Sequence, residues 1–406
     1  MNTSDLRYTD SPTPEIEIDI LSAIRKLTSE EFAPRAKQYD NSYTFPIENM
    51  QALFRVGLNA ATISNEFGGL GLSNNKGNIR LLWSMITEVA KADMSTARCW
   101  EGHNNAMMLI DNLGTDVQKD QWFQGIVERG ELWAVWSGEP LLKTPGQTQK
   151  LGTSLVQTED GYLLNGTKVF CTGATHVNKA ILLVNTAGAG GARHASDSPE
   201  SVVMLACDLA DATVSYDDSW WKPIGMRGSV SCLVKFDNTF IPFENQIGEP
   251  GQFLKEEWQT YWTPQYAATF LGAAEAAYDY TLSYVKNQHR QNDPFIQQRV
   301  AKMRMNIQSA HMWLDHVAAL WRDKRLEEAK LAGNMARYQI EQLATQTVDH
   351  ATHACGARAL IQPSSLERIL RDLSIYVRHD NDDHVLATIG KSLLGESHDS
   401  SFFNSK

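Results

Sequence analysis

The sequence of 406 residues contains few cysteines, no long apolar run and no excess of positive charge. Its five cysteines are isolated and lack the Cys-x-x-Cys or Cys/His spacing of a zinc site, so we expect reduced, buried thiols and no metal. No run of about 18 apolar residues is found, which argues against a membrane-spanning helix. The N-terminus lacks the apolar core of a signal peptide, and together with the dispersed cysteines this predicts a cytoplasmic protein.

The charge balance is negative, with a net charge of −11 at pH 7. A nucleic-acid partner is therefore not expected, because binding to phosphates needs a basic surface. The negative total does not exclude a small anionic substrate held in a local basic pocket. Hydrophobic residues make up 42% and charged residues 21% of the chain, which is typical of a globular protein.

Three regions differ in their hydrophobic pattern. Residues 1–130 carry apolar residues at helical spacing, interrupted by the glycine-rich segment NEFGGLGLS. Residues 131–248 contain short β-rich runs, two of which flank a predicted hairpin turn at Glu159–Gly161. Residues 249–395 return to long helical patterns, and residues 396–406 are typical of a loosely held tail. Helices before and after a segregated sheet predict an α+β fold.

Several segments resemble the acyl-CoA dehydrogenase superfamily, in the same order and over nearly the whole chain. They are LFRVGLNAATISNEFGGLGLS, LWAVWSGEP, GYLLNGTKVFCTGATHVNKAILLV, GMRGSVSCLVKFDNTFIPFENQIG and LERILRDLSIYVRHD. The resemblance implies an N-terminal helical domain, a central β-domain and a C-terminal four-helix bundle, usually assembled as a homotetramer. It also implies a flavin cofactor and a small-molecule substrate.

The resemblance assigns contacts to the flavin. A flavin ring needs hydrogen bonds at N5 and along its pyrimidine edge, and an apolar platform against one face. Thr172 matches the family residue whose hydroxyl approaches N5, and Phe170, expected on the same face of the strand, would be the platform. Ser137 would contact the pyrimidine edge. Arg290 and Gly356 match segments that contact the far end of FAD, and the segment of Arg290 reaches the FAD of a neighbouring subunit.

A helical pattern over residues 364–379 leads to the pair His379-Asp380, where many dehydrogenases of the family carry Tyr-Glu with the glutamate as base. The branch similar to dibenzothiophene monooxygenase resembles this chain in carrying His-Asp. A histidine suits oxygen chemistry, because an imidazole can hydrogen-bond a flavin C4a-hydroperoxide and supply its proton. Asp380 is alternatively a shortened dehydrogenase base, and His379 alternatively a cation that stabilises the end of the helix.

A second histidine, His103, falls where the resemblance places the substrate cavity. We consider it either an active-site histidine or a core histidine whose hydrogen bonds are satisfied.

Segments that bind the tail of FAD in the dehydrogenases differ in this chain. Glu139-Pro140 is followed by Leu-Leu-Lys-Thr, and the segments of Arg290 and Gly356 keep only part of the family pattern. These departures favour FMN over FAD, and a monooxygenase that uses O2 and receives reduced flavin from a separate reductase, since no second nucleotide-binding motif is found. The alternatives are an FAD-dependent dehydrogenase of acyl-CoA or acyl-carrier-protein thioesters with Asp380 as base, and a non-catalytic flavin-binding homologue.

Overall fold

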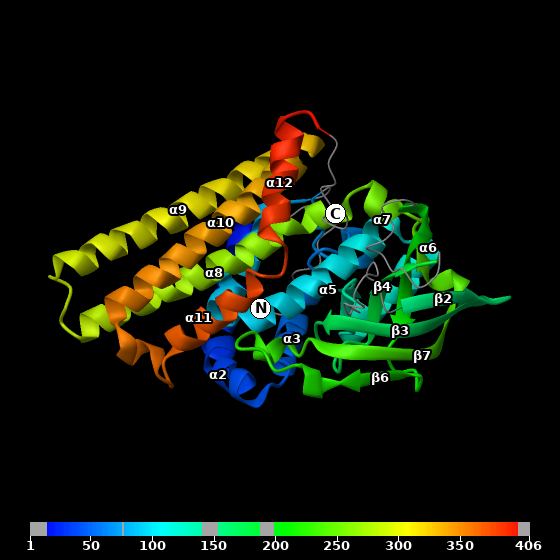
Figure 1. The fold of residues 1–406 in the computed structure, drawn as a ribbon, viewed down its shortest axis with the longest axis horizontal. Helices are drawn as coiled ribbons and strands as arrows, with labels where there is room; N and C mark the ends of the chain where they lie inside the picture. The colour runs from blue at the N-terminus through cyan, green and yellow to red at the C-terminus, as the bar shows by residue number, and fades with distance from the viewer. Residues whose placement is uncertain (1–13, 75–76, 140–152, 187–198, 397–406) are drawn as a thin grey trace, which may run out of the picture.

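The computed structural model describes residues 14–74, 77–139, 153–186 and 199–396. Helices come first, strands occupy the middle of the chain, and helices return after them (Figure 1). This order confirms the α+β fold class and the helical, β and helical architecture expected from the sequence. The segment that follows Glu139, and all but the first residue of the expected tail, lie outside the described residues.

The N-terminal region is a set of helices whose apolar faces pack on one another: α1 (Pro14–Leu27), α2 (Ala33–Ser42), α3 (Ile47–Arg55), α4 (Ile79–Ala92), α5 (Met94–Leu113) and α6 (Asp116–Arg129). Asp93 separates α4 from α5 and caps α5, because its carboxylate accepts a hydrogen bond from the backbone N–H of Thr96 (3.1 Å). α5 is buried along almost its whole length. Both halves of the site described below contact this helix.

The described strands form two four-stranded sheets, in the orders β1-β4-β5-β8 and β2-β3-β7-β6. Their bounds are β1 (Trp133–Trp136), β2 (Thr153–Gln157), β3 (Gly161–Cys171), β4 (Lys179–Asn185), β5 (Val202–Asp208), β6 (Val214–Asp217), β7 (Cys232–Pro242) and β8 (Gln246–Ile247). β1 and β4 pair in parallel, and the other pairs are antiparallel. The predicted hairpin turn at Glu159–Gly161 is present and joins β2 to β3.

The C-terminal region begins with a short helix and continues as a bundle of long ones: α7 (Gln252–Lys255), α8 (Trp258–Asn287), α9 (Pro294–Arg322), α10 (Leu326–Cys355), α11 (Ser365–Tyr376) and α12 (Asp382–Leu393). α8, α9 and α10 lie side by side (Figure 1). α8 also packs against α4 of the N-terminal region. The bundle is thereby joined to the helix pair α4–α5.

The helical pattern over residues 364–379 ends earlier in the structure than in the sequence. α11 stops at Tyr376, and α12 begins at Asp382. Two contacts favour this break: Arg337 donates to the carbonyl of Val377 (3.1 Å), and the side chain of Asn381 caps α12. His379 and Asp380 therefore lie in the turn between the two helices.

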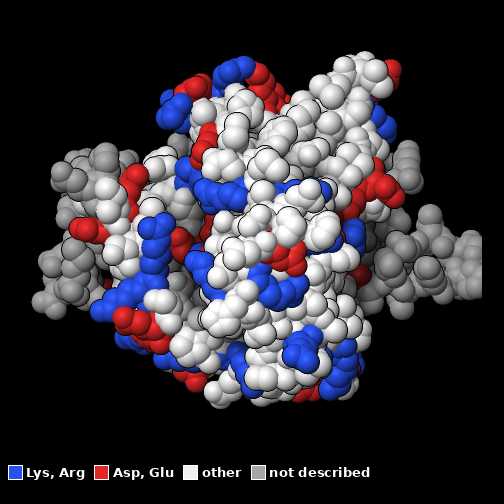
Figure 2. Space-filling view, turned by 90° about the vertical axis from the view of Figure 1, so that its left-hand side faces the viewer, with Lys and Arg blue, Asp and Glu red and all other residues white. Residues whose placement is uncertain are grey.

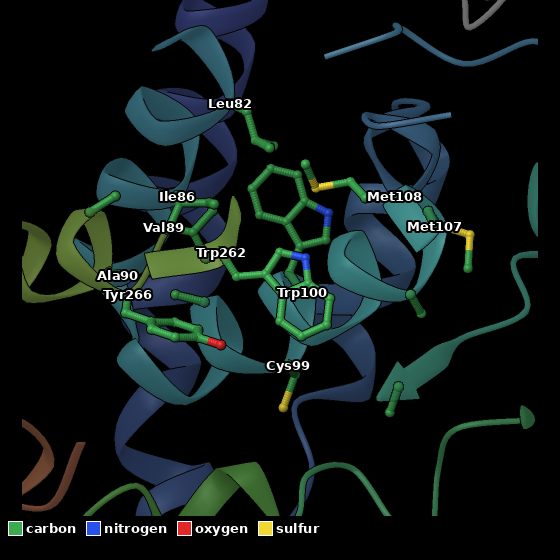
Figure 3. Packing of buried hydrophobic residues seen from close by; sticks show 14 of the residues in the cluster. Leu82, Ile86, Val89, Ala90, Cys99, Trp100, Met107, Met108, Trp262 and Tyr266 are labelled. Atoms are coloured by element: carbon green, nitrogen blue, oxygen red, sulfur yellow. The ribbon is translucent and has the colours of Figure 1, made fainter. Parts of the chain in front are cut away.

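The apolar core is continuous between α4, α5 and α8. Figure 3 shows aliphatic side chains of α4 beside aromatic side chains of α5 and α8, namely Leu82, Ile86, Val89 and Ala90 with Trp100, Trp262 and Tyr266. Large buried aromatic rings dominate the packing energy of such a core and hold α5 in a defined position.

Within the described ranges, no helix combines the length and apolar character needed to cross a membrane. The same ranges hold no group of three or more His, Cys, Asp or Glu side chains placed to bind a metal ion.

Candidate functional site

The first half of the site lies where β3 ends beside β1. Phe170 has a left-handed backbone conformation (φ 54°), and the register with β7 shifts between Lys168 and Cys171. Such a bulge interrupts the alternation of side chains along a strand. Phe170 is therefore 60% exposed while Thr172 is buried, which corrects the expectation that both project from one face of a regular strand. The exposed ring of Phe170 contacts Trp220 edge to face, with centroids 5.0 Å apart.

The hydroxyl of Thr172 belongs to a chain of hydroxyl groups. Its Oγ1 lies 3.1 Å from Oγ of Ser231, which lies 2.8 Å from Oγ of Ser229. On the opposite side, the indole N–H of Trp136 donates to the carbonyl of Thr172 (3.2 Å). Ser137 follows Trp136 directly and is half-buried. The structure thus places the three β-domain candidates on adjoining chain segments: Phe170 and Thr172 at the end of β3, and Ser137 next to Trp136, which contacts Thr172.

The second half of the site is the turn between α11 and α12. Nδ1 of His379 lies 3.1 Å from Oδ1 of Asp380, and its Nε2 lies 3.4 Å from Nη2 of Arg98. The ring also contacts Tyr266 and Tyr376, with centroid distances of 4.7 and 5.8 Å. Both ring nitrogens thus face side chains rather than the last carbonyls of α11, which disfavours the helix-stabilising alternative. Because Asp380 accepts the Nδ1 proton, Nε2 is the nitrogen available for chemistry.

Each oxygen of Asp380 faces a nitrogen atom of a basic side chain. Oδ1 faces His379, and Oδ2 lies 3.4 Å from Nε of Arg337, a fully buried arginine of α10. Arg337 is in turn paired with Asp382 (2.6 Å). Burial acts to raise the pKa of Asp380, but His379 and Arg337 outweigh burial and hold this pKa below its usual value. Asp380 is therefore a charged anchor for the His379 ring and a weak base.

Two charged residues of α5 complete this half of the site, and the sequence analysis did not identify them. Arg98 donates from Nη1 to Glu101 (2.7 Å), and the hydroxyl of Tyr376 donates to the other oxygen of Glu101 (2.8 Å). The guanidinium of Arg98 lies over the rings of Tyr266 and Tyr376, 5.9 and 5.8 Å from their centroids. Burial raises the pKa of Glu101, although Arg98 opposes the shift. In the sequence, Arg98 and Glu101 could have been noticed as a pair of opposite charges one helical turn apart, because the rest of α5 is almost uncharged.

α5 connects the two halves of the site. Sγ of Cys99 lies 4.0 Å from the backbone oxygen of Ser229, at the end of the hydroxyl chain, and the preceding residue Arg98 contacts His379. Phe170 and the hydroxyls of Ser137 and Thr172 offer the platform and the polar groups that a flavin ring needs, so these side chains fit the cofactor.

His103 lies in the core and not in this site. Its Nε2 lies 2.8 Å from the carbonyl of Asn59, and its Nδ1 accepts a hydrogen bond from the backbone N–H of Trp133 (3.1 Å). Burial lowers the pKa of His103 to about 4, so the ring is neutral at neutral pH. Both nitrogens are thus used by the backbone, which corrects the expectation of an active-site histidine in favour of the core alternative.

Arg290 and Gly356 lie together, but away from the other candidates. Arg290 follows α8 and donates to the carbonyl of Ala354 (3.3 Å), near the end of α10, while its Nη2 pairs with Asp293 (3.4 Å). Gly356 is the first residue after α10. This end of the bundle is on the left in Figure 1, opposite the β-domain, and Figure 2 shows its Lys and Arg side chains interspersed with Asp and Glu. Within one chain these two residues do not join the β-domain candidates.

Two family models cover more than half of the chain. Residues 14–130 match the model described as acyl-CoA dehydrogenase, N-terminal domain, and residues 265–382 match acyl-CoA dehydrogenase, C-terminal domain. The chain belongs to the acyl-CoA dehydrogenase family. As a member of this family, it falls in the class of flavin-dependent oxidoreductases.

Individual relatives of this acyl-CoA dehydrogenase family member fall into two reaction classes. Mitochondrial isovaleryl-CoA dehydrogenase of Arabidopsis thaliana is 24% identical over 375 residues, which is 89% of this chain and 87% of the relative. The fold is similar to dibenzothiophene monooxygenase from Paenibacillus sp. A11-2 (20% identity, TM-score 0.82, 95% of this chain and 100% of the other), a protein also solved with FMN bound. It is equally similar to butyryl-CoA dehydrogenase from Megasphaera elsdenii (22% identity, TM-score 0.81, with the same coverage).

Proposed function

We propose that this flavin-dependent oxidoreductase is a monooxygenase, which uses reduced flavin and O2 to oxygenate a small organic substrate. The placement of Asp380 carries the proposal. Its position resembles that of the base which removes a proton from the acyl thioester in dehydrogenases. In this chain the carboxylate is one methylene shorter, faces His379 and Arg337, and has a lowered pKa, so it is a poor base. His379 instead presents Nε2, which can take up a proton and pass it on.

The flavin in this proposal is FMN, delivered in reduced form by a separate reductase. Its ring would lie against Phe170, with N5 near Thr172 and the pyrimidine edge near Ser137. When bound, the reduced flavin supplies the electrons that activate O2. FMN is favoured because both Nη atoms of Arg290, the family contact to the far end of FAD, are engaged within this chain. The departure from the family pattern after Glu139 supports the same choice.

The proposal is tested by following oxygen into product. The protein is mixed without O2 with chemically reduced FMN or FAD, then exposed to isotope-labelled O2 with a panel of aromatic heterocycles and organic acids. We expect labelled product with FMN, and less product when Phe170→Ala weakens retention of the flavin. A second arm offers acyl-CoA thioesters to FAD-loaded protein without O2. Bleaching of FAD in that arm, without labelled product in the first, would establish a dehydrogenase instead, and no reaction in either arm would indicate a non-catalytic homologue.

We also propose that the chain assembles as a homotetramer. Three large apolar side chains are exposed on α9: Phe295 at 75%, Met305 at 60% and Met312 at 62%. Large apolar side chains exposed along one long helix favour its contact with another copy of the chain. Light scattering of the purified protein is expected to report four times the chain mass of 45.4 kDa, and a monomeric mass would contradict this assembly.

A further inference from the structure

Arg98 presents one half of its guanidinium group to His379. Its Nη1 pairs with Glu101 at 2.7 Å, whereas its Nη2 lies 3.4 Å from Nε2 of His379. The second contact is long for a hydrogen bond between nitrogen atoms. An anion would form a shorter, charge-assisted bond of about 2.7–2.9 Å with the same Nη2 and could replace this contact.

The position of Arg98 is determined before any ligand arrives. The rings of Tyr266 and Tyr376 and the carboxylate of Glu101 hold the guanidinium in place. The side chain of Arg98 is 15% exposed and that of His379 is 27% exposed, so both are partly accessible, and their nitrogens lie only 3.4 Å apart. A rigid guanidinium group in a poorly hydrated setting suits an acidic group, because little entropy is lost on binding.

The carboxylates near Arg98 are occupied by other partners. Glu101 also accepts hydrogen bonds from the hydroxyls of Tyr376 and Thr269, and Asp380 is engaged by His379 and Arg337. The groups that face Arg98 are thus two shared carboxylates, two tyrosines and one histidine. Nη2 is the part of this cluster that remains for an incoming anion.

We propose that the substrate is a small organic acid and that Arg98 binds its carboxylate, sulfinate or sulfonate group. The inference rests on the proposed function and deepens it by naming the substrate class. When the acid binds, its oxygen takes the place of Nε2 of His379 as the acceptor for Nη2 of Arg98. Nε2 of His379, which faces the donor Nη2 in the free protein and is therefore unprotonated there, is thereby released to take up a proton from solvent and pass it on beside the molecule that is to be oxidised. Arg98 is in this way the specificity-determining residue of the site.

The experiment measures binding and requires no turnover. Oxidised, flavin-loaded protein is titrated by calorimetry with acetate, butyrate, benzoate and benzenesulfinate, and with the neutral acetamide, butyramide, benzamide and benzenesulfinamide. At least one acid is expected to bind roughly tenfold or more tightly than its amide. Arg98→Gln is expected to weaken binding of that acid by about 30-fold or more, since it removes one partner of a largely buried charge pair. The visible absorbance of the flavin reports the same binding independently.

Two further variants serve as controls for the proposed role of Arg98. Arg378→Gln removes a nearby arginine that is 66% exposed and pairs with Asp382, and it should leave acid binding unchanged. Arg98→Gln combined with Glu101→Gln removes both buried charges, should preserve folding, and should still lose acid binding. Equal affinity for every acid and its amide, or acid preference that survives Arg98→Gln, overturns the inference. Acid binding without oxygenation would overturn the monooxygenase proposal only.

Discussion

Replacing His379 by alanine is expected to lower the yield of oxygenated product by roughly 10²–10⁴-fold, the usual contribution of a general acid or base. The structure gives the reason: Asp380 orients the ring through Nδ1, so Nε2 is the nitrogen through which the site can take up a proton and pass it on. FMN should still bind, because Phe170, Thr172 and Ser137 lie on the β-domain side of the site. Product is measured by mass spectrometry, and the O2 consumed should appear as hydrogen peroxide.

Two further variants distinguish a role of His379 in the reaction from a purely structural role. Asp380→Asn keeps a hydrogen-bond partner for Nδ1 but removes its charge, and it should lose less product than His379→Ala. His353→Ala changes a histidine of the bundle that is 56% exposed, and it should have no effect. If His379→Ala forms product at the unmodified rate with FMN bound, His379 has no part in the reaction.

Replacing Lys168 by methionine is expected to destabilise the protein by about 3–5 kcal/mol, the usual loss when one partner of a buried ion pair is removed. Lys168 is fully buried on β3, and its Nζ donates to Glu139 (2.5 Å) and to the carbonyl of Leu183 (2.6 Å) on β4. Glu139 also accepts a hydrogen bond from the hydroxyl of Thr153 on β2. The pair thus joins the two sheets, and its loss leaves a buried carboxylate without a counter-charge.

Calorimetry should report a decrease in Tm of roughly 4–6 °C for a chain of this size. The double variant Lys168→Met with Glu139→Met removes both charges and should recover most of the lost stability, since apolar replacements of a buried pair are often nearly neutral. Lys179→Met, which breaks the more exposed pair with Asp208, should change the unfolding free energy by no more than about 1 kcal/mol. A Lys168→Met variant as stable as Lys179→Met would show that the buried pair contributes nothing.

Only some residues of the candidate site could be predicted from the sequence. Ser137, Phe170, Thr172 and the pair His379-Asp380 lie in segments whose order and spacing resemble the family, so a resemblance could identify them. Arg98 has no such motif around it. Its role depends on His379, which is 281 positions away in the chain, and no local pattern carries that information.

The sequence by itself determined the helical, β and helical order, the hairpin at Glu159–Gly161 and the family, because hydrophobic periodicity and motif spacing are local properties. Only the tertiary structure decided how individual side chains are used. A bulge turns Phe170 outward, and backbone groups 44 and 30 positions away occupy both nitrogens of His103. The position of Asp380 between His379 and Arg337 is also set by chain segments that meet only on folding. The reactivity of a side chain depends on the groups that surround it in space, and those groups are determined by how the whole chain packs.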